Sequence, residues 1–176
     1  MKNESLKMIV TLLVICVLIA GGMSVVNGIT APIIAQNDVE KLNSSLALVL
    51  DADTFTETDA EENVQVYLAK KGGEQVGVCV VCTETGYGGD VKVLVGVKAD
   101  STVTGVQILS HSETAGLGAN AEKESFRTQY IGKTSGVSVV KNSPKDNEIQ
   151  AISGATITSN AVTRAVNRAI EIAAQY

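Results

Sequence analysis

Residues 148–160 read EIQAISGATITSN, and they predict three elements in immediate succession. The apolar run 149–152 is typical of a short buried strand. Small residues follow and predict a tight turn that a backbone or a ligand can approach closely: Ser153, Gly154 and Ala155. A helix is expected directly after this turn.

Residues 161–176 carry apolar side chains at spacings of three and four, which predicts an amphipathic C-terminal helix. Thr158, Ser159 or Asn160 could each cap the start of this helix. Thr156 would then lie on a loop just before the helix, where free N–H groups and the helix dipole favour a phosphate.

The same stretch resembles the flavinylation motif of covalent FMN-binding domains. These domains occur in the G subunit of the Rnf complex and in the C subunit of the sodium-pumping NADH:quinone reductase. The resemblance rests on the sequence SGATITS over residues 153–159. In that family the threonine after Gly-Ala carries FMN through a phosphoester, which implies a covalent FMN at Thr156. The resemblance implies that the other cofactor-binding residues of this motif are Ser153, Gly154, Ala155 and Thr158. The family usually has an aspartate three residues before the serine, whereas this chain has Gln150, with Glu148 as the nearest acid.

Two further segments resemble the same family. The loop 110–119 contains the single histidine, His111, and is typical of an ordinary turn when it is taken alone. It is similar to the family segment His-x-Glu-Thr-Pro-Gly-Leu-Gly, with Ala115 in place of the proline. Residues 86–89 likewise resemble the family's Gly-Tyr-Gly-Gly turn. Three segments in the family order, over residues 86–163, indicate membership.

The resemblance also implies which side chains meet the cofactor. Residues of the second segment are expected at the isoalloxazine ring, where charge and hydrogen bonds tune a flavin: Glu113, Thr114 and Leu117, with backbone groups of Gly116 and Gly118 nearby. Tyr87 either covers a flavin face or is a partly exposed turn residue. No residue is expected to act as a catalytic acid, base or nucleophile.

Length, net charge and aromatic content limit the classes of function that the chain could have. A chain of 176 residues accommodates one soluble domain and an anchor. A net charge of −5 argues against nucleic-acid binding, which needs clustered Lys and Arg. Aromatic residues make up 3% of the chain, with no Trp, which disfavours base stacking.

The N-terminal region predicts a membrane anchor. Residues 8–37 carry no charge, and the apolar run 8–26 spans about 28 Å as a helix, close to the thickness of a bilayer core. A cleaved signal peptide is the alternative, but its apolar core is usually ~7–15 residues long and an Ala-x-Ala site would follow. We therefore predict one transmembrane helix over residues 8–30, in contact with lipid.

Flanking charges predict the orientation of this anchor. Lys2 and Lys7 precede the apolar run, and the first charges after it are Asp38 and Glu40. By the positive-inside rule, residues 1–7 are cytoplasmic and the rest of the chain lies outside. The expected order after the anchor is a connecting helix and loop over residues 31–63, then an extracytoplasmic covalent FMN-binding domain over residues 64–176.

Alternating and β-branched runs predict an α+β fold with a mainly antiparallel sheet and flanking helices. Residues 32–50 are expected to continue the helix, and residues 51–63 to form a loop or short helix. Residues 91–98 predict a half-buried strand of period two, in a hairpin with the next strand. The predicted strands are 64–68, 76–83, 91–98, 103–109 and 137–140, with a helix over 121–130.

Cys79 and Cys82 form the only Cys-x-x-Cys pair. Such a pair can be a redox dithiol or half of a zinc site. Here it interrupts a β-branched run, and residues three apart on a strand point to opposite faces. Two buried thiols and no metal site are therefore expected.

These inferences predict an electron-carrying subunit of a membrane-bound, ion-translocating ferredoxin:NAD oxidoreductase, the Rnf complex. The resemblance implies membrane and iron–sulfur subunits as partners, and a flavin transferase for maturation. Alternatives within this class are a C-type subunit of a sodium-pumping quinone reductase or a stand-alone extracellular flavin carrier. A rival from another class is a non-enzymatic, membrane-anchored binding or sensor domain, in which residues 153–156 are only a turn before a helix.

Overall fold

The structure is a computed structural model that describes residues 2–58 and 63–176. The chain divides into two compact units, residues 1–40 and 41–176. Helix α1 (Lys2–Val49) is continuous and contains Pro32. Among the described residues, α1 is the one helix that is long and apolar enough to cross a membrane.

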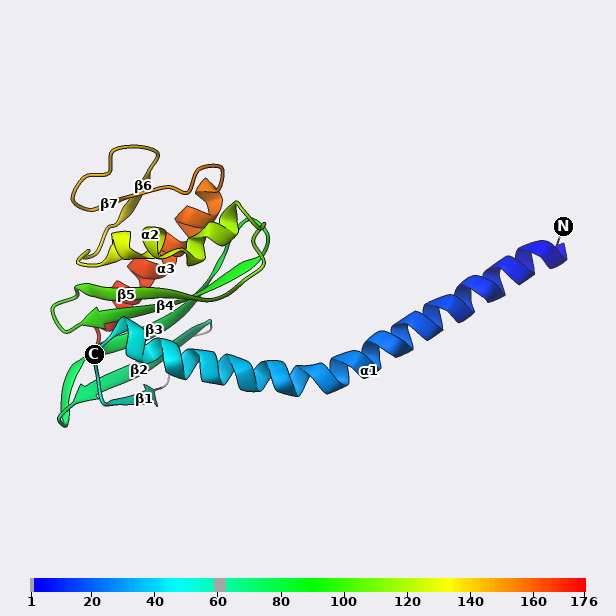
Figure 1. The fold of residues 1–176 in the computed structure, drawn as a ribbon, viewed down its shortest axis with the longest axis horizontal. Coiled ribbons are helices and arrows are strands. Elements are labelled where there is room, and N and C mark those ends of the chain that lie inside the picture. The colour runs from blue at the N-terminus through cyan, green and yellow to red at the C-terminus, as the bar shows by residue number, and fades with distance from the viewer. Residues whose placement is uncertain (1, 59–62) are drawn as a thin grey trace. The chain divides into compact units, whose positions relative to one another are not determined.

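The second unit is an α+β domain built on a five-stranded antiparallel sheet (Figure 1), as the sequence predicts. The strands follow one another in the sheet in chain order: β1 (Thr54–Thr58), β2 (Val64–Lys71), β3 (Glu74–Thr85), β4 (Asp90–Lys98) and β5 (Val103–His111). A separate parallel pair is formed by β6 (Ser138–Val140) and β7 (Glu148–Gln150). The remaining elements are helical: η1 (Gly118–Glu122), α2 (Glu124–Arg127), η2 (Thr128–Tyr130) and α3 (Thr156–Ala173).

The sequence prediction was wrong at one of these elements. Residues 51–63 were expected to form a loop or short helix, but β1 lies within them and pairs antiparallel with β2; residues 59–62 of that prediction lie outside the described residues. The helical prediction for residues 121–130 is confirmed, and the structure divides it into three short helices in succession. The hairpin of β4 and β5 is confirmed.

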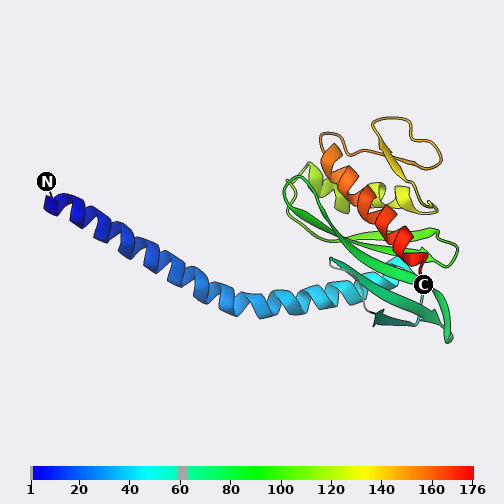
Figure 2. The same ribbon diagram turned by 180° about the vertical axis from the view of Figure 1, so that it is seen from behind.

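Helix α3 lies across one face of the sheet, as the two opposite views show (Figure 2). Its buried face includes Val162, Val166 and Ile170, which pack against valines of β2, β3 and β4. This packing buries the period-3.6 apolar stripe of the helix and places the start of α3 at the loops that follow β3 and β5.

The opposite face of the sheet is covered by the last turn of α1, so the prediction of a half-buried β4 is wrong. Leu46 and Val49 are each 2% exposed and pack in one cluster with Leu94 of β4. Gly96 and Gly105 face each other across β4 and β5. A Cβ on either glycine would collide with the backbone of Val49, so the close approach requires both glycines.

Cys79 and Cys82 are buried free thiols on opposite faces of β3, as expected. Burial raises the pKa of each thiol to about 12, so neither is a thiolate at neutral pH. Within the described residues there is no group of three His, Cys, Asp or Glu side chains that could hold a metal ion.

Candidate functional site

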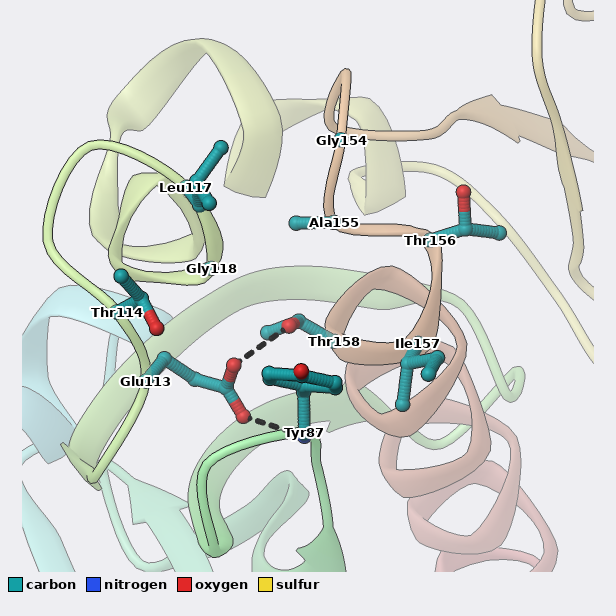
Figure 3. Close-up of a pocket in the computed structure, with 10 residues that line it drawn as sticks. All are labelled: Tyr87, Glu113, Thr114, Leu117, Gly118, Gly154, Ala155, Thr156, Ile157 and Thr158. Atoms are coloured by element: carbon teal, nitrogen blue, oxygen red, sulfur yellow. Dashed lines mark hydrogen bonds between the residues drawn. The ribbon is translucent and has the colours of Figure 1, made fainter.

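Three segments that are distant in sequence enclose a cavity of about 440 Å³ (Figure 3). They are the loop after β3, the loop that leads from β5 into η1, and the turn that opens α3. The lining residues are Tyr87, Glu113, Thr114, Leu117, Gly118, Gly154, Ala155, Thr156, Ile157 and Thr158. This volume lies in the usual range of ligand pockets, ~300–1,000 Å³.

Helix α3 begins three to five residues earlier than the sequence indicates. Its first residue is Thr156, Ala155 precedes it, and no side chain of the described residues caps it. The prediction that Thr158, Ser159 or Asn160 is the N-cap is therefore wrong. The bond from Ser159 N to Ala155 O (3.0 Å) is the first of the helix, so the N–H groups of residues 156–158 precede the helical ladder.

Ser159 braces the turn instead of capping the helix. Its Oγ donates to Ala155 O (2.9 Å) and accepts from Ile152 N (3.0 Å), and its side chain is fully buried. Gly154 has φ +77°, a conformation that glycine adopts without strain. The turn that presents Thr156 is thus held in place by the helix that it opens.

Thr156 is exposed, and its hydroxyl makes no hydrogen bond with any residue that the structure describes. Figure 3 shows the Thr156 side chain at the edge of the cavity, directed away from Glu113 and Thr158. The hydroxyl is therefore accessible from outside while the backbone beside it lines the cavity.

The floor of the cavity is organised by the carboxylate of Glu113, which is 9% exposed. Its Oε1 accepts hydrogen bonds from Tyr87 N (2.7 Å) and Gly88 N (3.2 Å). Its Oε2 accepts a hydrogen bond from Thr158 Oγ1 (2.8 Å), as Figure 3 shows. One side chain thus joins all three segments.

These bonds set the ionisation of Glu113. Burial by itself raises the pKa of this carboxyl group, but the bonds from Thr158, Gly88 and Tyr87 outweigh burial and hold the pKa below its ordinary value. Glu113 is therefore ionised at neutral pH.

Two glycines make room for this carboxylate. A Cβ on Gly86 would collide with Glu113 Oε1, and a Cβ on Gly118 would collide with Oε2 and lie 2.8 Å from Thr158 Oγ1. Neither position can carry a larger side chain unless the floor rearranges.

His111 orients the loop that carries Glu113. Its Nδ1 accepts a hydrogen bond from Glu113 N (3.1 Å). Its Nε2 lies 3.4 Å from Glu122 Oε1. The residue therefore has a definite contact to the site, which the interpretation as an ordinary turn did not include.

The rim of the cavity is apolar and exposed. Tyr87 is 73% exposed, Leu117 46% and Ile157 53%. Tyr87 is thus an exposed turn residue whose side chain also lines the cavity.

The cavity brings together nine of the eleven residues that the sequence indicates: Tyr87, Glu113, Thr114, Leu117, Gly118, Gly154, Ala155, Thr156 and Thr158. Ser153 and Gly116 do not line it, and Ile157 was missed. Ile157 lies inside the motif, between Thr156 and Thr158, and this position was the one feature of the sequence that could have indicated it as a site residue.

The chain matches known proteins in sequence. The family model of the FMN-binding domain matches residues 86–171. The G subunit of the proton-translocating ferredoxin:NAD(+) oxidoreductase complex of Clostridium ljungdahlii is 43% identical over 145 residues, which cover 81% of this chain and 77% of that protein. The corresponding protein of the Na(+)-translocating complex of Acetobacterium woodii is 41% identical over 79% of this chain and 65% of that protein. The G subunit of the ion-translocating oxidoreductase complex of Methanosarcina acetivorans is 32% identical over 97% of this chain and 95% of that protein.

Two solved structures share the fold. The C subunit of the Na(+)-translocating NADH-quinone reductase from Parabacteroides distasonis superposes with a TM-score of 0.53 at 25% identity, over 65% of this chain and 68% of that chain. Shewanella oneidensis NqrC gives a TM-score of 0.52 at 22% identity, over 64% and 62% of the two chains. The second likeness is one of fold alone.

Proposed function

Because this chain belongs to the family of G subunits of ion-translocating oxidoreductase complexes, we propose that it carries electrons through an FMN esterified to Thr156. It is a subunit of an ion-translocating oxidoreductase complex and contains an FMN-binding domain. The whole complex is a ferredoxin:NAD oxidoreductase of the Rnf type, in which this chain is one carrier and is not catalytic alone.

The observation that carries the proposal is the placement of Thr156. It is the exposed first residue of α3, on the edge of the cavity, and no side chain of the described residues caps the helix there. The N–H groups of residues 156–158 can donate hydrogen bonds to a phosphate at this helix end, and the helix dipole favours its negative charge. A phosphoester on Thr156 Oγ would lie where these groups are available.

The cavity fits a flavin attached at that point. Its apolar rim offers Leu117, Ile157 and the Tyr87 ring as surfaces for a planar aromatic group. Backbone and hydroxyl groups of the loops supply the few polar contacts that such pockets use for orientation. A bound FMN would supply reversible electron transfer, and the chain would hold and tune it.

Attachment balances as a phosphoryl transfer from FAD. The bond from Thr156 Oγ to the FMN phosphorus forms as the pyrophosphate bond of FAD breaks, AMP leaves, and the hydroxyl proton is released. A separate flavin transferase performs this step. Covalent retention suits a domain outside the cytoplasm, because a freely dissociating flavin would be lost there.

Location and partners complete the proposal. Helix α1 anchors the chain in the cell membrane, with residues 1–7 in the cytoplasm and the flavin domain outside. The anchor keeps the domain near the membrane and iron–sulfur subunits that exchange electrons with it. The rival hypothesis, a binding or sensor domain without a flavin, is disfavoured by the match to the FMN-binding domain.

The test is co-expression of the full chain with a flavin transferase. The wild type should fluoresce as a flavoprotein in a denaturing gel, and Thr156→Ala should lose that fluorescence completely. Thr156→Ser is the matched variant, because it keeps the hydroxyl, and it should retain fluorescence. Fluorescence that persists in Thr156→Ala would overturn the assignment.

Mass spectrometry should locate the group. Trypsin cleavage after Lys145 and Arg164 yields the peptide 146–164, which contains Thr156 and four other hydroxyl residues. Its mass should rise by that of FMN less one water, and fragmentation should place the increase on Thr156. An unmodified peptide from protein made with an active transferase would leave only an anchored domain of another purpose.

A further inference from the structure

The carboxylate of Glu113 is already occupied by the chain. It receives three hydrogen bonds, from Tyr87 N, Gly88 N and Thr158 Oγ1, at 2.7, 3.2 and 2.8 Å. A carboxylate offers about four acceptor positions. Little of its capacity is left for a ring donor, so its main contacts are to the protein and not to a ligand.

The negative charge of Glu113 is balanced by dipoles and not by an ion pair within the described residues. No lysine or arginine in the part of the chain that the structure describes forms an ion pair with it. His111, from the same loop, accepts a hydrogen bond from Glu113 N, and its proximity also helps to lower the pKa of the Glu113 carboxyl group. Among the described residues, the groups that donate hydrogen bonds to the carboxylate are neutral and come from the turn after β3 and from α3, and Glu113 lines the cavity.

We propose that Glu113 is a positioning residue that joins the three cavity segments and that its charge lowers the midpoint potential of the flavin in that cavity. This inference rests on the proposed function. A fixed negative charge beside a ring makes the addition of electrons less favourable, and the effect is stronger in a partly desolvated site than in water. The potential of this carrier would thus be set by a residue that also holds the pocket together.

If Glu113 had only a structural role, the midpoint potential would respond differently to its replacement. It would be needed for folding and flavin retention, but replacing its charge with a neutral group of the same shape would leave the potential unchanged. The midpoint potential therefore separates the two roles.

The experiment uses the full chain, co-expressed with a flavin transferase and kept in detergent. Glu113→Gln can accept the Tyr87 and Gly88 N–H groups through its amide oxygen and donate to Thr158 Oγ1, so the contacts remain and the charge is lost. In a spectroelectrochemical titration its midpoint potential should be more positive than that of the wild type. Glu124→Gln is the matched control, because it removes the same charge from an exposed side chain outside the cavity, and its potential should equal that of the wild type.

Thr158→Val tests whether the charge of Glu113 or its hydrogen bond to Thr158 sets the potential. It removes one hydrogen bond and keeps the carboxylate, so the protein should unfold more easily while the potential stays at or below the wild-type value. A rise in its potential like that of Glu113→Gln would assign the effect to the hydrogen bond and overturn a role for the charge.

Equal potentials in the wild type and in flavin-loaded Glu113→Gln would overturn the proposal. If Glu113→Gln does not fold, infrared difference spectra of the wild type with ¹³C-labelled glutamate decide. Reduction should perturb an ionised carboxylate band that Thr158→Val shifts, and a protonated carboxyl band in its place would overturn the proposal. If the wild type itself carries no flavin, the proposed function has failed and not this inference.

Discussion

The floor and the rim of the cavity come from the same three segments but differ in what their groups already contact. On the floor, the carboxylate of Glu113, the hydroxyl of Thr158 and two backbone N–H groups bond to one another. On the rim, the side chains of Tyr87, Leu117 and Ile157 are exposed. The floor therefore stabilises the fold without a ligand, whereas the rim gains contacts only when a ligand arrives.

Overpacking the floor should have the largest effect. Gly118→Val would drive a branched side chain into Glu113 and Thr158, so we expect the free energy of unfolding to fall by about 3 kcal/mol. Urea denaturation of the full chain in detergent measures the change. Ala115→Ser, on the exposed part of the same loop, is the control and should change stability by less than about 0.5 kcal/mol. A Gly118→Val protein as stable as the wild type would show that the floor is not tightly packed.

Removing the central acceptor should cost somewhat less. Glu113→Ala leaves two backbone N–H groups and the Thr158 hydroxyl without their acceptor, and we expect a loss of about 2 kcal/mol in unfolding free energy. The loss should be present without flavin, because the bonds do not depend on it. Equal stability in the flavin-free proteins would contradict the division between floor and rim.

Acid should weaken the floor and leave the rim unchanged. The folded pKa of Glu113 lies below its ordinary value, so its contribution to stability is complete above the unfolded pKa of about 4.3 and is lost as the pH falls through the folded pKa. In that window the unfolded state binds more protons than the folded state. Denaturation at a series of acidic pH values should therefore show a shallower decline for Glu113→Gln than for the wild type. Parallel declines would argue against this bond network.

Truncating the rim should have the smallest effect on stability. Leu117 is 46% exposed, so Leu117→Ala should change the free energy of unfolding by less than about 0.5 kcal/mol. The flavin spectrum should nevertheless change, because the side chain lines the cavity. Absorbance and fluorescence of the loaded variant, compared with its urea midpoint, check both parts. An unchanged spectrum would remove Leu117 from the flavin site.

Local patterns were sufficient to predict the central strands of the sheet. The alternating valines of β4, followed closely by the predicted strand 103–109, predicted a hairpin, and the structure has that hairpin. Strand β1 was missed because its sequence, TFTET, is polar and its pairing with β2 is a tertiary contact. The second covered face of β4 was missed for a similar reason, since α1 supplies the cover from more than 40 residues away in the sequence.

At the candidate site, too, local sequence patterns did not predict the tertiary contacts. Small residues and a family motif were enough to bring most of its members together, but not to assign their contacts. Thr158 and Ser159 look like caps in the sequence, yet their hydroxyls bond to Glu113 and to the turn before α3. Glu113 lies 45 residues before Thr158, and no local pattern reports a hydrogen bond over that separation.

The close packing of Val49 against Gly96 and Gly105 has a practical consequence for the design of a soluble fragment. A chain that starts after residue 50 would expose the patch of sheet that Leu46 and Val49 now cover, where each buried side chain is worth about 1.5–3 kcal/mol. Such a fragment should aggregate in solution or be degraded during expression. A fragment that starts at Lys41 retains Leu46 and Val49 over the sheet, and it is the fragment to use for crystallisation.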